Sequence, residues 1–123
     1  APYEVRSSCD GITSGADSLP AGSFGMTPVY SETDKWVYPG GSANQGTMPA
    51  GAVLGSAGPA ITQNALIYSS ESGTSTARII QVYYGISPKK AGGADPFPGY
   101  VPIPLTQKPG RYSGNVIITL SLK

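Results

Sequence analysis

The sequence predicts an all-β fold, a sandwich of seven or eight short strands, and three features of the chain lead to this prediction. Glycine and proline are frequent, with 17 and 12 residues, and they interrupt every stretch long enough for an amphipathic helix. Between these breakers, short segments alternate apolar and polar side chains with the period of a strand. Turn-forming sequences separate the segments at the spacing typical of a sandwich.

The first four predicted strands are short and are bounded by glycine, proline and small polar residues. They are residues 3–9, 24–30, 35–38 and 52–54. The loops that follow the third and fourth, PGGSANQG at 39–46 and SAGP at 56–59, consist of turn-forming residues. We therefore expect loops at these positions, with 39–46 forming a hairpin loop.

The last four predicted strands are residues 61–68, 77–86, 100–105 and 112–122. Segment 77–86 is apolar on both faces in places, which predicts a central strand covered on both sides or a strand that flanks a groove. Segment 100–105 contains Pro102 and Pro104, which remove two ladder donors and predict an edge strand or a polyproline-like crossing. Segment 112–122 has apolar side chains at 112, 116, 118, 120 and 122 and polar ones at most odd positions, which predicts a strand with one buried face.

Length and composition indicate one globular domain. A chain of 123 residues buries about two thirds of its unfolded surface around a single core. Charged residues make up 12% and the net charge is +1, so the clusters of Lys and Arg that bind phosphate backbones are absent from the sequence. We expect no nucleic-acid partner. Because no apolar run is long enough to cross a bilayer, we also expect no membrane insertion.

The residue types argue against an enzyme, a metal site and a cofactor. The sequence has no histidine and one cysteine, Cys9, which excludes a Cys-His zinc site and the usual Ser-His and Cys-His nucleophiles. We expect Cys9 to be buried as a small apolar residue. Glu32 and Asp34 would point to the same face if this segment were a strand, and a glycosidase needs two carboxylates that flank the bond it cleaves. The turn-forming residues in the surrounding YSETDKW favour a solvated turn instead. The glycine-rich loop at 39–46 lacks the lysine of a phosphate-binding loop.

The end of the chain resembles the C-terminal signature of chaperone–usher pilus subunits. Gly110 and Tyr112 open the sequence GRYSGNVIITLSL, a G-x-Y-x-G motif followed by alternation. This form is most similar to the alternate class that includes the CS1 and CFA/I fimbrial proteins, and the endings of spore-coat-U-like archaic pilins are similar too. A second match, GADSLPAGSFGMTPVYS at 15–31, resembles the segment after the N-terminal arm in that class, where a D-x-x-L-P turn precedes a strand ending in Tyr-Ser.

The resemblance implies an incomplete immunoglobulin-like sandwich of about seven strands, which a donor strand from another subunit completes. Residues 12–123 would form the body and residues 1–11 an N-terminal arm, with Tyr3 and Val5 as its donor residues. A groove beside the last strand would accept a strand of a periplasmic chaperone and later the arm of the next subunit. The predicted wall of this groove, which would also bind the chaperone, consists of Gly110, Tyr112, Val116, Ile118, Leu120 and Leu122. The alternative is a complete sandwich in which this strand belongs to the core.

The function implied by the resemblance is that of a structural pilus subunit. Its partners would be neighbouring pilus subunits, the periplasmic chaperone and the outer-membrane usher, and its location the extracellular surface of the cell after export through the periplasm. Two alternatives remain. One is a tip adhesin or glycan-binding β-sandwich that contacts a host glycan or receptor through Trp36 and Tyr84. The other is a virion decoration protein.

Overall fold

The structure is a computed structural model that describes residues 1–37, 46–73, 76–86 and 92–123. The described residues form an all-β fold of antiparallel sheets with one 3₁₀ turn, η1 (Ala21–Ser23). The strands are β1 (Tyr3–Ser8), β2 (Thr13–Ser14), β3 (Asp17–Ser18), β4 (Phe24–Ser31), β5 (Val53–Leu54), β6 (Gly58–Pro59), β7 (Ala65–Ser69), β8 (Ile79–Ile86) and β9 (Ile117–Leu122). The fold class predicted from the sequence is therefore confirmed.

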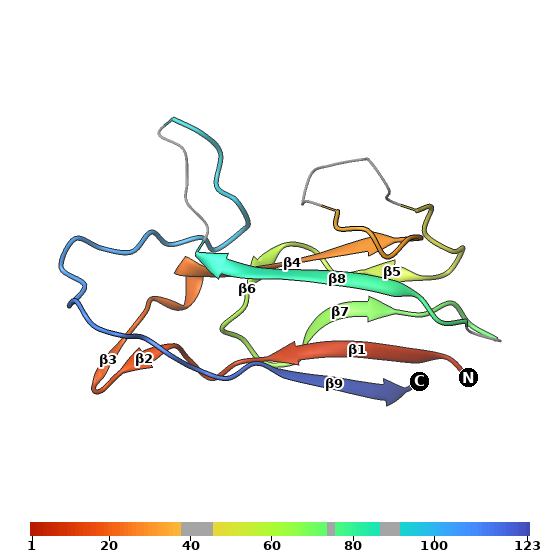
Figure 1. Ribbon diagram of the computed structural model, residues 1–123, viewed down its shortest axis with the longest axis horizontal. Helices are drawn as coiled ribbons and strands as arrows, with labels where there is room; N and C mark the ends of the chain where they lie inside the picture. The colour runs from red at the N-terminus through yellow and green to blue at the C-terminus, as the bar shows by residue number, and fades with distance from the viewer. Residues whose placement is uncertain (38–45, 74–75, 87–91) are drawn as a thin grey trace.

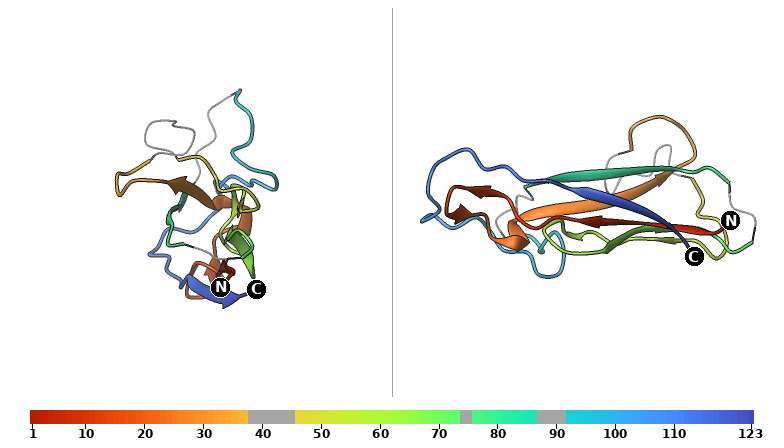
Figure 2. Two further views of the ribbon diagram at one scale, coloured as in Figure 1. Left: turned by 90° about the vertical axis from the view of Figure 1, so that its right-hand side faces the viewer. Right: turned by 90° about the horizontal axis from the view of Figure 1, so that it is seen from below.

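Two sheets build the sandwich. The first has the strand order β5-β7-β1-β9 and the second the order β6-β4-β8, while β2 and β3 form a separate hairpin. Figure 1 shows β4 and β8 running along one side of the molecule and β1, β7 and β9 along the other. The view along the long axis in Figure 2 separates β4 from β1 and β9. Both chain ends lie at the same end of the sandwich.

The core lies between the two sheets and is rich in tyrosine. Its buried centre consists of Met26, Tyr30, Ala60, Ile67 and Tyr68. Tyr30 of β4 stacks on Tyr68 of β7 with ring centroids 6.5 Å apart, so this pair joins the second sheet to the first. From β8, Ile80, Val82 and Tyr84 pack against the same cluster, because alternate residues of a strand share a face.

Several sequence predictions differ from the structure in position or type. Segment 77–86 forms β8, which is the outer strand of a three-stranded sheet and not a central one, since it pairs with β4 alone among the described strands. Residues 35–37 and 100–105 form no strand. The two prolines in 102–104 explain the second difference, since they remove the ladder donors. Residue 38 and most of the loop at 39–46 lie outside the described residues.

Candidate functional site

The two segments that the sequence singles out, one near each end of the chain, meet in the first sheet. β1 lies between β7 and β9 and pairs antiparallel with both. Opposite residues in the β1–β9 pair are Tyr3 with Leu122, Val5 with Leu120 and Ser7 with Ile118. Residues opposite one another across an antiparallel pair project to the same face. The structure thus brings the expected donor residues beside three of the expected wall residues within one chain.

The inward face of β1 is only partly apolar. Tyr3 and Val5 pack against the core, and the Tyr3 ring lies 6.0 Å from that of Tyr68. Ser7 is completely buried, and its hydroxyl lies 3.0 Å from the hydroxyl of Tyr84 on the opposite sheet. Cys9, the next inward residue, is also buried, as expected. The hydrogen bond satisfies two hydroxyls that would otherwise be costly to bury, so a serine is tolerated on the inward face of β1.

The beginning of β1 is held by residues that follow β7. The Tyr3 backbone nitrogen donates to the Ser70 hydroxyl over 2.8 Å, and the Ser70 nitrogen donates to the Tyr3 carbonyl over 2.8 Å. Next to Ser70, Glu71 accepts a 2.8 Å hydrogen bond from the Arg78 guanidinium. This bond holds the pKa of the Glu71 carboxyl below its ordinary value, and burial raises the pKa of the Tyr68 hydroxyl, which the Glu71 charge raises further.

β9 forms the border of the first sheet and is exposed on both faces. No other strand of the described residues pairs with its second edge. Ile118, Leu120 and Leu122 face the core side, yet they are 52%, 67% and 76% exposed. The second sheet ends at β8 and does not cover them. An uncharged edge strand with exposed aliphatic side chains is a surface that favours pairing with another chain.

Two of the other expected wall residues, Gly110 and Tyr112, lie apart from this surface. Tyr112 precedes β9, and its hydroxyl accepts a 2.9 Å hydrogen bond from Gln107 and donates one of 2.6 Å to the carbonyl of Lys108. Gly110 packs closely on Ser14, since a Cβ there would lie 2.8 Å from the Ser14 hydroxyl oxygen. Both residues therefore shape the loop beside the β2–β3 hairpin. Val116 is 37% exposed and lies just before β9.

The two expected glycan contacts do not form a common surface. Tyr84 faces the core and contacts Ser7, whereas Trp36 is 73% exposed. Trp36 instead lies against Tyr83, with ring centroids 6.1 Å apart and an edge-on geometry. The Gln81 side chain fixes the backbone on both sides of Trp36: it accepts from the Val37 nitrogen and donates to the Lys35 carbonyl, each over 2.7 Å.

Sequence reasoning did not identify Ser7, Ser70 or Gln81 as important. All three are polar residues whose partners are distant in sequence, and periodicity gives no information on such contacts. Within the described ranges, no group of three or more His, Cys, Asp or Glu side chains is arranged to hold a metal ion. Nor does any helix there have the length and apolar character needed to cross a membrane.

The chain matches no known family model, no curated protein and no solved structure. The sequence and the geometry described above are therefore the basis of the functional proposal.

Proposed function

We propose that the protein is a structural subunit of an extracellular bacterial pilus, in which β1 of one subunit completes the first sheet of the next. The observation that carries this proposal is the register of β1 against β9. Tyr3 and Val5, the donor residues, lie opposite Leu122 and Leu120, the acceptor residues. An identical strand from a neighbouring copy would make the same contacts, which is the basis of domain swapping.

The connection of β1 to the body supports the exchange. β1 and β9 are paired up to Ser8 and Ile117, and the two segments meet again at Thr13 and Ser113. Residues 9–12 between these points contain Gly11 and belong to no strand. A change of direction in this short link would release β1 from its own body without altering the second sheet. Because the contact is between unlike surfaces, repetition of the exchange yields a fibre.

The exposed edge of β9 supports a further assembly partner, on the side of β9 away from β1. A strand that approaches this edge finds unpaired backbone groups and the exposed side chains of Ile118, Leu120 and Leu122. Main-chain pairing with alternate side chains in contact is the mode of recognition known as β-augmentation. In the proposed pathway a periplasmic chaperone binds this edge before assembly at the outer-membrane usher, whereas β1 of the neighbouring subunit enters between β7 and β9.

A paired-cysteine experiment tests the exchange. Glu4 and Ser121 lie opposite one another in the β1–β9 pair, so cysteines at both positions come within disulfide range. Glu4→Cys and Ser121→Cys are introduced together with Cys9→Ser, and the reduced protein is refolded at high concentration before oxidation. We expect a ladder of covalent dimers, trimers and larger species on non-reducing gels, which collapses to monomer after reduction.

The matched control places the two cysteines within the second sheet, which takes no part in the exchange. Thr27 and Tyr83 are opposite residues of β4 and β8, so Thr27→Cys with Tyr83→Cys should give an intrachain bond at every concentration. If the Glu4–Ser121 pair also gives monomers alone, β1 stays in its own sheet and the proposed exchange is wrong.

A second candidate function, adhesion through a bound glycan, is favoured by the presentation of Trp36. An exposed indole beside Tyr83, with its backbone fixed by Gln81, is a preorganised stacking surface for a sugar ring. Binding to a glycan array that is lost in Trp36→Ala and kept in Tyr84→Phe would support adhesion. Equal binding by the wild type and Trp36→Ala would exclude this surface.

A further inference from the structure

A pocket opens where β1 and β9 separate. Between the Ser8–Ile117 pair and the Thr13–Ser113 pair, residues 9–12 face the shorter segment 114–116. Because the two segments differ in length, the ladder cannot continue between them. The Cys9 nitrogen turns away and donates instead to the Thr62 carbonyl over 2.9 Å. The result is a cavity of about 530 Å³, within the range of small-molecule sites.

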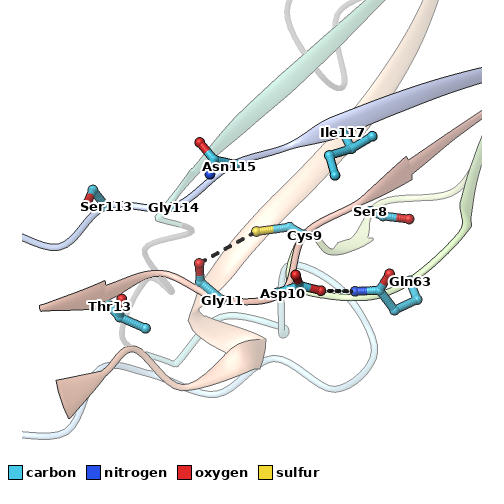
Figure 3. A pocket seen from close by; sticks show the side chains of 10 residues that line it. All are labelled: Ser8, Cys9, Asp10, Gly11, Thr13, Gln63, Ser113, Gly114, Asn115 and Ile117. Atoms are coloured by element: carbon cyan, nitrogen blue, oxygen red, sulfur yellow. Dashed lines mark hydrogen bonds between the residues drawn. The ribbon is translucent and has the colours of Figure 1, made fainter. Parts of the chain in front are cut away.

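One wall of this pocket is braced by hydrogen bonds. The Gln63 amide donates to Asp10 Oδ1 over 2.7 Å, and the Asn64 nitrogen donates to the Ser8 hydroxyl over 2.9 Å. Figure 3 shows the Asp10–Gln63 pair on this wall. The bonds orient Asp10 before any ligand arrives and leave its second carboxylate oxygen for a ligand. Such preorganisation lowers the free-energy cost of binding.

The other wall comes from the segment that leads into β9. Asn115 and Ile117 lie there, across the pocket from Asp10 and Gln63 in Figure 3. Among the described residues, the Asn115 side chain makes no hydrogen bond, so its amide can both donate and accept. Ile117 is 60% exposed and supplies an apolar surface beside these polar groups.

The chemistry of the lining defines the class of ligand. The described lining residues include one carboxylate, two amides and three hydroxyls, and no Lys or Arg: Ser8, Cys9, Asp10, Gly11, Thr13, Gln63, Ser113, Gly114, Asn115 and Ile117. An anion would be repelled by Asp10 and would find no cation. A wholly apolar ligand would leave the polar groups unsatisfied. A neutral ring with hydroxyls on its edge and carbon–hydrogen bonds on its face satisfies both kinds of surface.

We propose that this pocket binds one unit of a neutral sugar, with Asp10 and Asn115 bound to neighbouring hydroxyls and Ile117 against the ring. The site is distinct from the Trp36 surface, which lies on the second sheet. The site belongs to the closed chain, because residues 9–12 form one of its walls and would change direction in the proposed exchange. The site therefore does not rest on the proposed function.

Titration of the 123-residue chain with sugars tests the proposal. The probes are glucose, galactose, mannose and N-acetylglucosamine, and the readout is the amide resonances of Asp10, Gly11, Gly114 and Asn115 in two-dimensional NMR. We expect at least one neutral sugar to shift these resonances with a Kd below about 10 mM. N-acetylneuraminic acid, an anionic sugar, should bind at least about tenfold more weakly because of Asp10.

Two substitutions probe the walls separately. Asp10→Asn keeps the shape but removes the charge, and Asn115→Ala removes an exposed amide that supports no other described residue. Each should weaken binding about tenfold, the effect expected for a lost hydrogen bond to a sugar hydroxyl. Trp36→Ala should leave binding unchanged. The proposal is overturned if no neutral sugar shifts these resonances, if the anionic sugar binds best, or if binding depends on Trp36 and not on the pocket. The proposed exchange is judged separately, by the cross-linked ladder.

Discussion

The backbone nitrogen of Lys123 donates a 3.0 Å hydrogen bond to the carbonyl oxygen of Pro2, so the two ends of the chain lie side by side. The Lys123 ammonium group adds bonds of 2.9 Å to the Ser69 hydroxyl and 2.7 Å to the Ser70 carbonyl, which tie this end of β9 across β1 to the end of β7. Since β1 and β9 are antiparallel, a short turn from Lys123 to Ala1 would convert them into a hairpin.

This geometry predicts the effect of moving β1 to the other end of the chain. In the variant, residues 1–9 are removed from the start and attached after Lys123 through an Asn-Gly turn. The strand then re-enters the same position with the same direction, and it is held by a hairpin. We expect a cooperative monomer that forms no polymers at any concentration, with a Tm equal to or above that of the wild type. Size-exclusion chromatography with light scattering and thermal unfolding measure both properties.

A variant that lacks residues 1–9 altogether is the companion to this experiment. Burial of side chains such as Tyr3 and Val5 contributes about 1.5–3 kcal/mol each, against about 5–15 kcal/mol for a whole domain. We expect this variant to unfold unless a synthetic peptide of residues 1–9 is added. A stable, cooperatively folded deletion variant would contradict the central position of β1.

Substitution of Ile118 should separate folding and exchange from binding at the free edge of β9. Its side chain is 52% exposed, so Ile118→Asp should change the free energy of unfolding by no more than about 1 kcal/mol. An exchanged β1 makes the same contacts with β9 as the chain's own β1, so the ladder in the paired-cysteine experiment should persist. A chaperone strand added at the free edge would bury the new carboxylate, however, and we expect co-purification with the chaperone to be lost.

Thr119→Asp is the control for Ile118→Asp. Thr119 lies on the same strand but faces the other way, opposite Arg6, so the new carboxylate meets a positive charge. Co-purification with the chaperone should persist in this variant. If both substitutions abolish it, the strand is sensitive to any negative charge, and the core-side face has no special role.

The Glu71–Arg78 pair predicts a pH dependence of stability. Because Arg78 lowers the pKa of Glu71 in the folded protein, the Glu71 carboxyl binds a proton less readily in the folded state than in the unfolded state. The resulting stabilisation is fully present at a pH above the ordinary glutamate pKa of 4.5, and it is lost as the pH falls through the lower pKa of Glu71 in the folded state. Thermal unfolding of the wild type from pH 7 to pH 3 should therefore show a larger loss of Tm than Glu71→Gln shows. Equal losses would mean that Glu71 makes no contribution to acid sensitivity.

The alternation of apolar and polar residues in the sequence predicted the strands β1, β4, β8 and β9, because each of these segments is bounded by residues that interrupt regular structure. It placed Ile118, Leu120 and Leu122 on one face, as the structure has them, but the buried face predicted for this strand is wrong because all six residues of β9 are exposed. The pattern extended this strand too far toward its start, however, since residues 112–116 alternate without forming a ladder. Alternation reports which side chains could share a face, and it does not report where a partner strand ends.

Pairing between distant segments was beyond the reach of the sequence. Nothing in YEVRSSC indicates that it lies between β7 and β9 in its own chain, or that Ser7 reaches Tyr84 across the core. The short strands β2, β3 and β6 were missed for a similar reason. They consist of two residues each, mostly Gly, Pro, Ser and Thr, and become strands through their neighbours.

The pocket between β1 and β9 depends on a close approach of two glycines, which gives a final prediction. A Cβ on Gly114 would fall well inside van der Waals distance of the Gly11 carbonyl oxygen and 2.7 Å from Ile12 Cδ1. Gly114→Ala must therefore push the two segments apart, and overpacking of this kind costs about 1–3 kcal/mol.

The control is Gly85→Ala in β8, where a new Cβ meets no atom within 4 Å. Both substitutions reduce the conformational entropy of the unfolded chain by about the same amount, so this effect cancels in the comparison. In denaturant unfolding, Gly114→Ala should therefore be the less stable of the two by about 1–3 kcal/mol. Equal stabilities would show that Gly114 and Gly11 are not in close contact, and that the segments beside the pocket are free to separate.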